Sequence, residues 1–176
     1  MKFEPLPVDG AFAVDMESHV DERGFFARSW SAEAFAAQGL EAAVAESSIS
    51  FNRLAWTLRG LHYQLEPHAE TKLVRCTRGS AFDVVVDLRP SSRTFKRFAA
   101  VTISADNWRA VYVPEGCAHG FETLEPNTEI LYQISRAYAP DYARGVRWND
   151  PAFRIPWPAP PSCISERDRN YSDFMA

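Results

Sequence analysis

Residues 71–88 read TKLVRCTRGSAFDVVVDL, and this stretch decides the fold class. Its two halves predict strands over Thr71–Thr77 and Ala81–Leu88, because β-branched and aromatic residues alternate there around a short Arg-Gly-Ser turn. If the turn closes a hairpin, Lys72 and Asp83 lie near each other on the inward face. A charge on an inward face is costly unless it is paired or used. An ordinary salt bridge at the sheet edge is the simpler explanation of the pair.

Similar short segments continue in both directions along the chain. Further strands are expected over Ala43–Phe51, Phe95–Ile103, Ala110–Val113, Gly120–Leu124 and Thr128–Ser135. Turn residues separate them at intervals of about ten residues, which is typical of a sandwich or barrel, and a jelly roll is the leading candidate. Upstream, Ser31 can cap a helix over Ala32–Gln38, which Gly39 ends in a left-handed conformation. The expected fold is therefore all-β with short peripheral helices.

Composition sets the outer limits of this interpretation. The 176 residues suit a single domain, 1–176, with a proline-rich extension from residue 150 wrapped over the barrel. An apolar share of 46% suffices for a core. The net charge of −4 argues against binding nucleic acid, and no apolar run reaches the roughly 18 residues that span a membrane. Three cysteines without a CxxC pair predict reduced thiols and a cytoplasmic protein.

Three side chains could carry chemistry inside such a barrel. Tyr132 shares a strand face with Ile130 and Ile134, so it is expected to point inward, where its hydroxyl needs a partner. His62 and His119 each adjoin glycines that allow a backbone or a ligand to approach closely. These features single the three residues out from the other polar side chains, whereas His19 and His68 are expected to be structural.

A metal centre is the main alternative use of the histidines. His62, Gln64 and His119 could all be ligands, but two imidazoles and one amide form a weak site. A mechanism without metal or other cofactor is therefore favoured. Three arginines occur in turn-like contexts and could clamp a diphosphate through bidentate hydrogen bonds, although surface solubility also explains them: Arg23, Arg59 and Arg167.

From Asp21 to Phe174, several segments together resemble the dTDP-4-dehydrorhamnose 3,5-epimerase family, nucleotide-sugar epimerases of the cupin superfamily. The segments that carry the resemblance are Asp21–Phe26, Leu58–Gln64, Lys72–Arg75, Asp83–Ser92, Val113–Phe121, Tyr132 with Tyr138, Trp148–Pro151 and Ile164–Asp168. The resemblance implies a cupin-type jelly-roll barrel and a nucleotide-diphosphate-linked 4-keto-6-deoxy sugar as substrate. It also implies epimerisation at C3, at C5 or at both through an enolate, without a cofactor, in a homodimer.

Roles for individual residues follow from the same resemblance. His62 would be the general base and Asp168 the carboxylate that orients it, with Tyr132 as the acid on the other face of the sugar. Lys72 would stabilise the enolate oxygen, and Asp83 would hold Lys72 in position. The expected contacts with the rest of the substrate come from His119, Tyr138, Arg59, Arg23 and Arg167.

Three positions depart from the family pattern, all at expected nucleotide contacts. The usual glutamate five residues after Arg23 is Arg28, a Gln-x-Asn triplet is replaced by Glu46-Ser47-Ser48, and a later glutamate is Ala143. Glu46 and Ser48 remain candidates for substrate binding, and the nucleotide base stays open. Two further functions remain open: a 3,4-ketoisomerase of similar sugars, which moves the carbonyl, and a sugar-binding cupin without catalysis.

Overall fold

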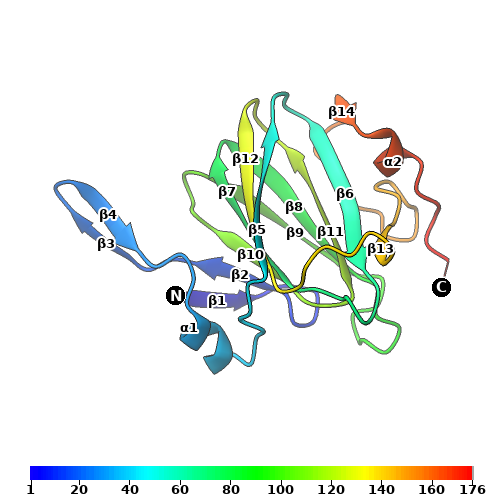
Figure 1. Cartoon of the computed structure of the whole chain (residues 1–176). Coiled ribbons are helices and arrows are strands. Elements are labelled where there is room, and N and C mark those ends of the chain that lie inside the picture. The colour runs from blue at the N-terminus through cyan, green and yellow to red at the C-terminus, as the bar shows by residue number, and fades with distance from the viewer. Residues whose placement is uncertain (176) are drawn as a thin grey trace.

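The structure is a computed structural model that describes residues 1–175, and it consists mainly of two facing β-sheets (Figure 1). In spatial order the first sheet contains β1 (Lys2–Pro5), β2 (Phe12–Asp15), β10 (Ala110–Val113), β7 (Lys72–Arg78), β12 (Thr128–Ile134) and β5 (Glu46–Asn52). The second contains β13 (Ala143–Gly145), β6 (Thr57–Gln64), β11 (Cys117–Thr123), β8 (Ser80–Asp87) and β9 (Phe98–Ser104), with β14 (Cys163–Ile164) also on β6. Neighbouring strands are antiparallel except for the β14–β6 pair. The all-β prediction is confirmed.

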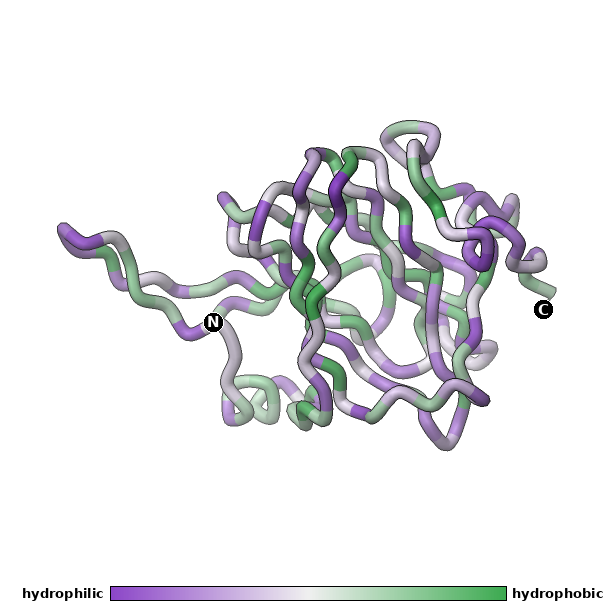
Figure 2. Tube along the Cα trace, turned by 45° about the horizontal axis from the view of Figure 1, so that its top comes forward, coloured by the Kyte–Doolittle hydropathy of each residue, from purple (hydrophilic) through white to green (hydrophobic). Residues whose placement is uncertain are grey.

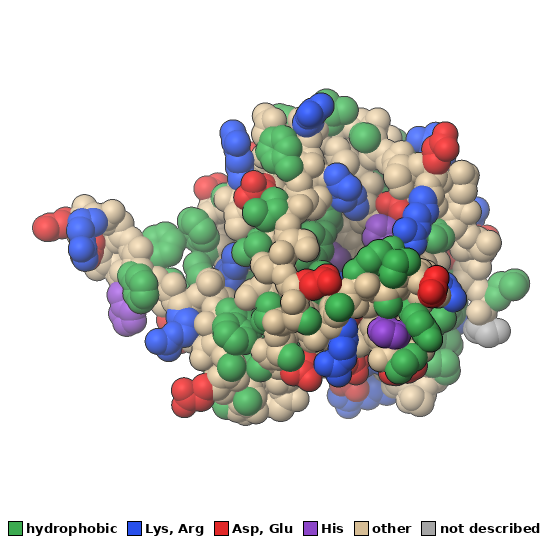
Figure 3. Space-filling view, in the orientation of Figure 1, with side chains coloured by type: hydrophobic (Ala, Val, Ile, Leu, Met, Phe, Trp, Pro, Cys, Tyr) green, Lys and Arg blue, Asp and Glu red, His purple; other side chains and the backbone are tan. Residues whose placement is uncertain are grey.

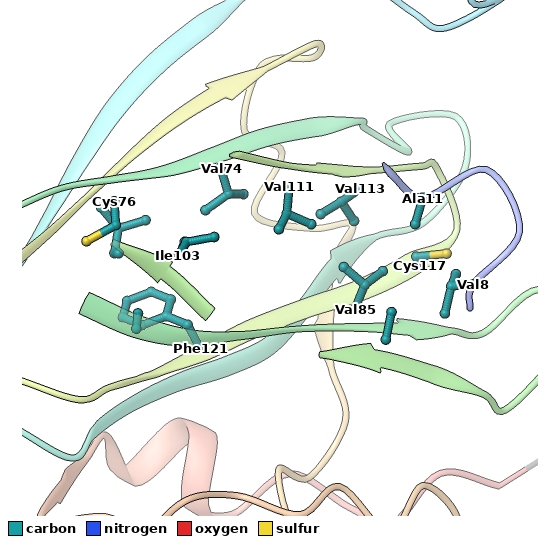
Figure 4. Packing of buried hydrophobic residues seen from close by; sticks show 13 residues of the cluster. Val8, Ala11, Val74, Cys76, Val85, Ile103, Val111, Val113, Cys117 and Phe121 are labelled. Carbon is teal, nitrogen blue, oxygen red and sulfur yellow. The ribbon is translucent and has the colours of Figure 1, made fainter. Parts of the chain in front are cut away.

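The main core lies between the two sheets (Figure 4). Val74 and Val111 of the first sheet meet Val85 and Phe121 of the second, and all four are at most 1% exposed. Burial of such a side chain stabilises the fold by roughly 1.5–3 kcal/mol. This core fixes the separation of the sheets, and a cavity opens beyond it.

The outer face of the second sheet is covered by the C-terminal segment. Val84 and Val86 of β8 point away from the main core and pack with Phe153 and Trp157. The uninterrupted apolar run of β8 is explained by this cover, because both faces of the strand are buried. The proline-rich segment thus wraps over the barrel and leads to α2 (Glu166–Arg169), a second short helix whose position was not predicted from the sequence.

A short helix and a projecting hairpin lie on the other side of the barrel. The helix α1 (Ala32–Ala37) begins after Ser31, whose side chain accepts a hydrogen bond from the Ala34 amide, and Gly39 follows with φ +69°. This confirms the predicted helix to within one residue. The hairpin of β3 (Ser18–Asp21) and β4 (Gly24–Ala27) stands clear of the barrel, and its tip is hydrophilic (Figure 1, Figure 2). We call this hairpin the arm.

The predicted hairpin between β7 and β8 is wrong. The two strands follow each other in the chain, but they lie in opposite sheets, and β7 pairs instead with β10 and β12. Gly79 has φ +73°, and a Cβ there would lie 2.5 Å from the Thr128 hydroxyl. The turn therefore carries the chain from one sheet to the other rather than closing a pair.

The other predicted strands are found with ends shifted by at most a few residues, and Ala110–Val113 has the predicted bounds. The strands that the sequence did not predict are β1, β2, the two strands of the arm, β6, β13 and β14. No helix among the described residues is long and apolar enough to cross a membrane.

A buried carboxylate ties down the loop that follows β8. Asp87 is fully buried and accepts hydrogen bonds from Arg89, Ser92 and Thr94. Burial raises the pKa of Asp87, but these hydrogen bonds outweigh it and lower the pKa to about 2. The loop is therefore held by a side chain that stays ionised at any ordinary pH.

Candidate active site

The open end of the barrel contains a cavity of about 590 Å³ between the two sheets. Figure 3 shows this face hollowed to the right of centre, with histidine side chains inside the hollow and Lys and Arg side chains around it. The lining side chains that could carry chemistry are Ser48, Arg59, His62, Lys72, His119, Tyr132, Cys163, Arg167 and Asp168. An adjoining lobe of about 170 Å³ adds Glu46, Glu70, Arg136, Tyr138 and Arg144. Of the twelve site residues predicted from the sequence, ten line the cavity or its lobe, and Asp83 and Arg23 do not.

An irregularity in β6 places two functional side chains on the cavity side. Arg59 and His62 are three residues apart, so regular alternation would send them to opposite faces. The β6–β11 register shifts at this point, and Gly60 has φ +134°. A Cβ on Gly60 would lie 2.6 Å from the Gly120 Cα, so the strands can approach this closely only with glycines at the crossing. Leu61, which lies between Arg59 and His62 in the chain, points outward and packs in the apolar cluster under the C-terminal segment.

Asp168 holds the imidazole of His62 from the C-terminal segment. The His62 Nε2–Asp168 Oδ1 distance is 2.7 Å, and the Gly60 amide donates to the other carboxylate oxygen at 3.2 Å. Ser165 caps α2 by accepting a hydrogen bond from the Asp168 amide at 3.0 Å. Burial raises the pKa of Asp168, but the hydrogen bond and charge of His62 and the other donors outweigh it, so the pKa is lowered. The carboxylate fixes the ring: with Nε2–H donated to Asp168, Nδ1 is the nitrogen left to accept a proton.

A second imidazole–carboxylate pair lies deeper in the same wall. His119 Nε2 and Asp83 Oδ2 are 2.8 Å apart, and both side chains are buried. The expectation that Asp83 holds Lys72 is therefore wrong, because β8 belongs to the opposite sheet and its carboxylate is engaged by His119. A hairpin at the turn after β7 would have placed Asp83 beside Lys72, so the sequence pattern did not point to His119 as its partner.

Lys72 begins β7 and reaches the cavity from the first sheet. Its ammonium lies 2.9 Å from Glu70 Oε1 and donates to the backbone oxygen of His62 at 3.2 Å. Glu70 was not among the residues predicted from the sequence. Its place two residues before Lys72 was the available signal, since alternation extended just ahead of the strand puts both side chains on one face.

Tyr132 faces the second sheet from β12, as its alternation with Ile130 predicts. Its ring packs edge-on against His119, with centroids 5.9 Å apart. Burial, together with the nearby charge of Asp83, strongly raises the pKa of Tyr132. The phenol is therefore protonated at neutral pH.

Two arginines lie at the mouth of the cavity, and a third does not. Arg59 donates from Nε to Asn52 Oδ1 at 2.8 Å. Arg167 lines both cavities, and its pKa is raised by a hydrogen bond with Tyr138. Arg23 lies near the tip of the arm, paired with a neighbouring aspartate and 84% exposed. Within one chain Arg23 does not reach the cavity, so its predicted role stays a prediction that needs a second copy.

The polar groups do not gather in a way that suits a metal ion. Gln64, one of the three considered ligands, donates from Nε2 to the His68 carbonyl and accepts from the Ala139 amide at Oε1, so both ends of its amide hold the backbone. His62 and His119 each pair with a carboxylate. Within residues 1–175, no group of three His, Cys, Asp or Glu side chains is arranged to hold a metal.

Comparisons with known proteins agree on one family. A sequence model described as dTDP-4-dehydrorhamnose 3,5-epimerase matches residues 5–176. The enzyme of that name from Shigella flexneri is 42% identical over 156 residues, which cover 88% of this chain and 86% of the relative. The crystal structure of the Bacillus anthracis enzyme with TDP and pyrophosphate bound has a TM-score of 0.91 and 38% identity, covering 94% of each chain.

A third relative has a narrower activity. It is a 3′-monoepimerase from Streptomyces bikiniensis in complex with dTDP-quinovose, with a TM-score of 0.88 and 33% identity. The match covers 96% of this chain and 86% of that one. These likenesses span nearly all of the chain and agree with its two-sheet barrel. The chain belongs to the dTDP-4-dehydrorhamnose 3,5-epimerase family and is a nucleotide-sugar epimerase.

Proposed function

We propose that this epimerase inverts C3 and C5 of a dTDP-linked 4-keto-6-deoxy sugar, with His62 as base, Tyr132 as acid and Lys72 beside the enolate oxygen. The observation that carries the proposal is the placement of His62 and Tyr132 on opposite sheets, β6 and β12, both lining one cavity. Inversion requires a proton to leave one face of the ring and another to arrive at the opposite face. A base and an acid on facing walls meet that requirement.

The steps conserve protons and electrons. His62 Nδ1 takes the proton from the carbon next to the C4 ketone, and the electron pair of the broken C–H bond moves to the C4 oxygen as an enolate. Lys72 donates to that oxygen and stabilises its charge. Tyr132 then gives its proton to the carbon from the opposite face, and proton exchange with water restores both side chains.

The electrostatics of the two walls support this division of roles. Asp168, whose pKa is lowered, stays ionised and stabilises the imidazolium that forms on His62. Tyr132, whose pKa is raised, stays protonated and suits a donor rather than a base. Arg59 and Arg167 at the mouth fit the diphosphate, for which planar guanidinium groups are well shaped.

The nucleotide and the reacting carbons are supported by the relatives. The Bacillus anthracis enzyme holds TDP and the Streptomyces bikiniensis enzyme holds dTDP-quinovose. Isothermal titration calorimetry with dTDP, UDP and GDP tests the base, and we expect selective binding of dTDP. Equal affinity for all three nucleotides would contradict the dTDP assignment.

Incubation with the dTDP-linked 4-keto-6-deoxy sugar in D2O tests the reaction. We expect deuterium at C3 and C5 by NMR, no exchange with His62→Ala, and exchange without inversion with Tyr132→Phe. His68→Ala is the matched control, because His68 lies outside the cavity and packs against Tyr142. Deuterium at C3 alone would indicate a 3-monoepimerase, and a displaced carbonyl would indicate a 3,4-ketoisomerase.

We further propose that the enzyme is a homodimer in which the arm serves a neighbouring cavity. Val20 and Phe26 on the arm are 78% and 76% exposed, which leaves an apolar surface that a second copy would cover. Arg23 near the arm's tip would then bring a further cation to the partner's diphosphate. Light scattering should give twice the chain mass, and Arg23→Ala should weaken dTDP binding; a monomer that binds dTDP unchanged would contradict this.

A further inference from the structure

The ammonium of Lys72 is held by two contacts that leave one donor free. A lysine side chain carries three N–H donors and no acceptor. Of these, one is directed to Glu70 Oε1 at 2.9 Å and one to the backbone oxygen of His62 at 3.2 Å. Lys72 lines both the main cavity and its lobe. The third donor is therefore the one available to an oxygen in the cavity.

Glu70 is buried in a way that stability alone does not explain. Its side chain is 5% exposed, and among the described residues its Oε2 atom is buried without a hydrogen-bond partner. An unsatisfied buried oxygen costs free energy, and a buried ion pair often adds little net stability. A carboxylate kept in this position at such a cost is typical of a group that serves the site.

We propose that Glu70 is the positioning residue that aims Lys72 at the sugar oxygen on which the enolate charge develops. The inference rests on the proposed role of Lys72 and adds the residue that directs it. Asp83, the partner expected from the sequence, is taken by His119 on the other sheet. Glu70 is the acidic side chain whose ion pair with Lys72 is seen.

The second contact links the lysine to the base. Lys72 donates to the main-chain oxygen of His62. The hydrogen bond therefore fixes the ammonium relative to the residue that we propose as the base. Glu70, just before β7, provides the second anchor for the ammonium. Loss of Glu70 leaves the lysine with one anchor and several rotamers, and misplacement by about 1 Å can cost about a hundredfold in rate.

Substitutions at Glu70 distinguish the placement of the Lys72 ammonium from the effects of the Glu70 charge and of changed stability. We expect Glu70→Ala to lower kcat about 10- to 100-fold while KM changes less than about threefold, because the contact acts on the enolate rather than on substrate binding. Glu70→Gln keeps the shape and one oxygen acceptor, so we expect it to recover part of the loss. Glu66→Gln is the matched control, since Glu66 is exposed in the same loop. Circular dichroism melting of each variant reports on the fold.

A double-mutant cycle with Lys72 decides between positioning and a general structural role. If Glu70 acts through the lysine, Glu70→Ala should have no further effect on kcat in the Lys72→Ala background. A full additional loss in that background, or a kcat for Glu70→Ala within about threefold of wild type, would overturn the inference while leaving the role of Lys72 intact. A wild-type rate in Lys72→Ala itself would overturn both.

Discussion

Replacing Asp168 by Asn removes one charge and almost no volume from the site. The carboxylate serves two donors at once: His62 Nε2–H at 2.7 Å and the Gly60 amide at 3.2 Å. An amide has one oxygen, so one donor would face the side-chain NH2 group instead. Either the ring loses its partner, or it turns over and presents the wrong nitrogen to the sugar.

The size of the effect follows from these two losses. A hydrogen bond to a charged group contributes about 1.5–3 kcal/mol, which corresponds to about 10- to 150-fold in rate. The wrong tautomer adds to this, and in a Ser-His-Asp enzyme the same exchange of Asp for Asn lowers kcat about 10⁴-fold. We therefore expect kcat for Asp168→Asn to fall by about 10²- to 10⁴-fold.

The assay is deuterium incorporation from D2O under saturating substrate, read by NMR, with dTDP affinity measured by calorimetry in parallel. Glu166→Gln is the matched control, because it removes a charge from the same helix at an exposed position. Nucleotide affinity should stay near wild type in both variants. A folded Asp168→Asn enzyme that exchanges deuterium within threefold of the wild-type rate would refute the role of the carboxylate.

Three further predictions concern stability and thiol chemistry. Gly60→Ala places a Cβ 2.6 Å from the Gly120 Cα and should cost about 2–5 kcal/mol in urea unfolding, whereas Gly39→Ala, with positive φ but open space, should cost about 1 kcal/mol. The lowered pKa of Asp87 means that its stabilisation is complete above pH 4 and is lost as the pH falls towards 2. Wild type should therefore lose about 2 kcal/mol more than Asp87→Asn on acidification. Cys163 should be the single thiol to react with Ellman's reagent before denaturation, because burial raises the pKa of Cys76 to about 11 and that of Cys117 to about 12. Bound dTDP should slow the reaction of Cys163, because Cys163 lines the cavity.

The strands that the sequence predicted are those that have regular alternation and clear turns. Thr128–Ile134 is such a strand, and its inward Tyr132 was placed correctly. The strand that matters most, Thr57–Gln64, was missed because Gly60 interrupts the alternation where the two sheet strands cross. The irregularity that hid the strand is the one that places Arg59 and His62 on the same side.

Contacts between distant segments were harder to predict than strands. The pair of His62 and Asp168 came from the family resemblance, since 106 residues separate them and no local pattern connects them. The error at Asp83 arose because a turn between consecutive strands was taken for a hairpin. Similar turn residues connect two strands of one hairpin and two strands that lie in opposite sheets. Which of the two connections forms depends on the packing of the whole barrel.

The position of Asp168 in the chain has a consequence for the order in which the enzyme is made. During synthesis the strands that form both sheets leave the ribosome before the segment that carries this carboxylate. The strands that carry His62, Tyr132 and Lys72 can thus assemble while His62 still lacks its partner Asp168. We expect a chain trimmed before Ser165 to bind nucleotide more weakly and to epimerise no sugar, because it lacks Arg167 as well as Asp168. We expect a protease that cuts just before α2 to abolish epimerisation while the strands of both sheets remain.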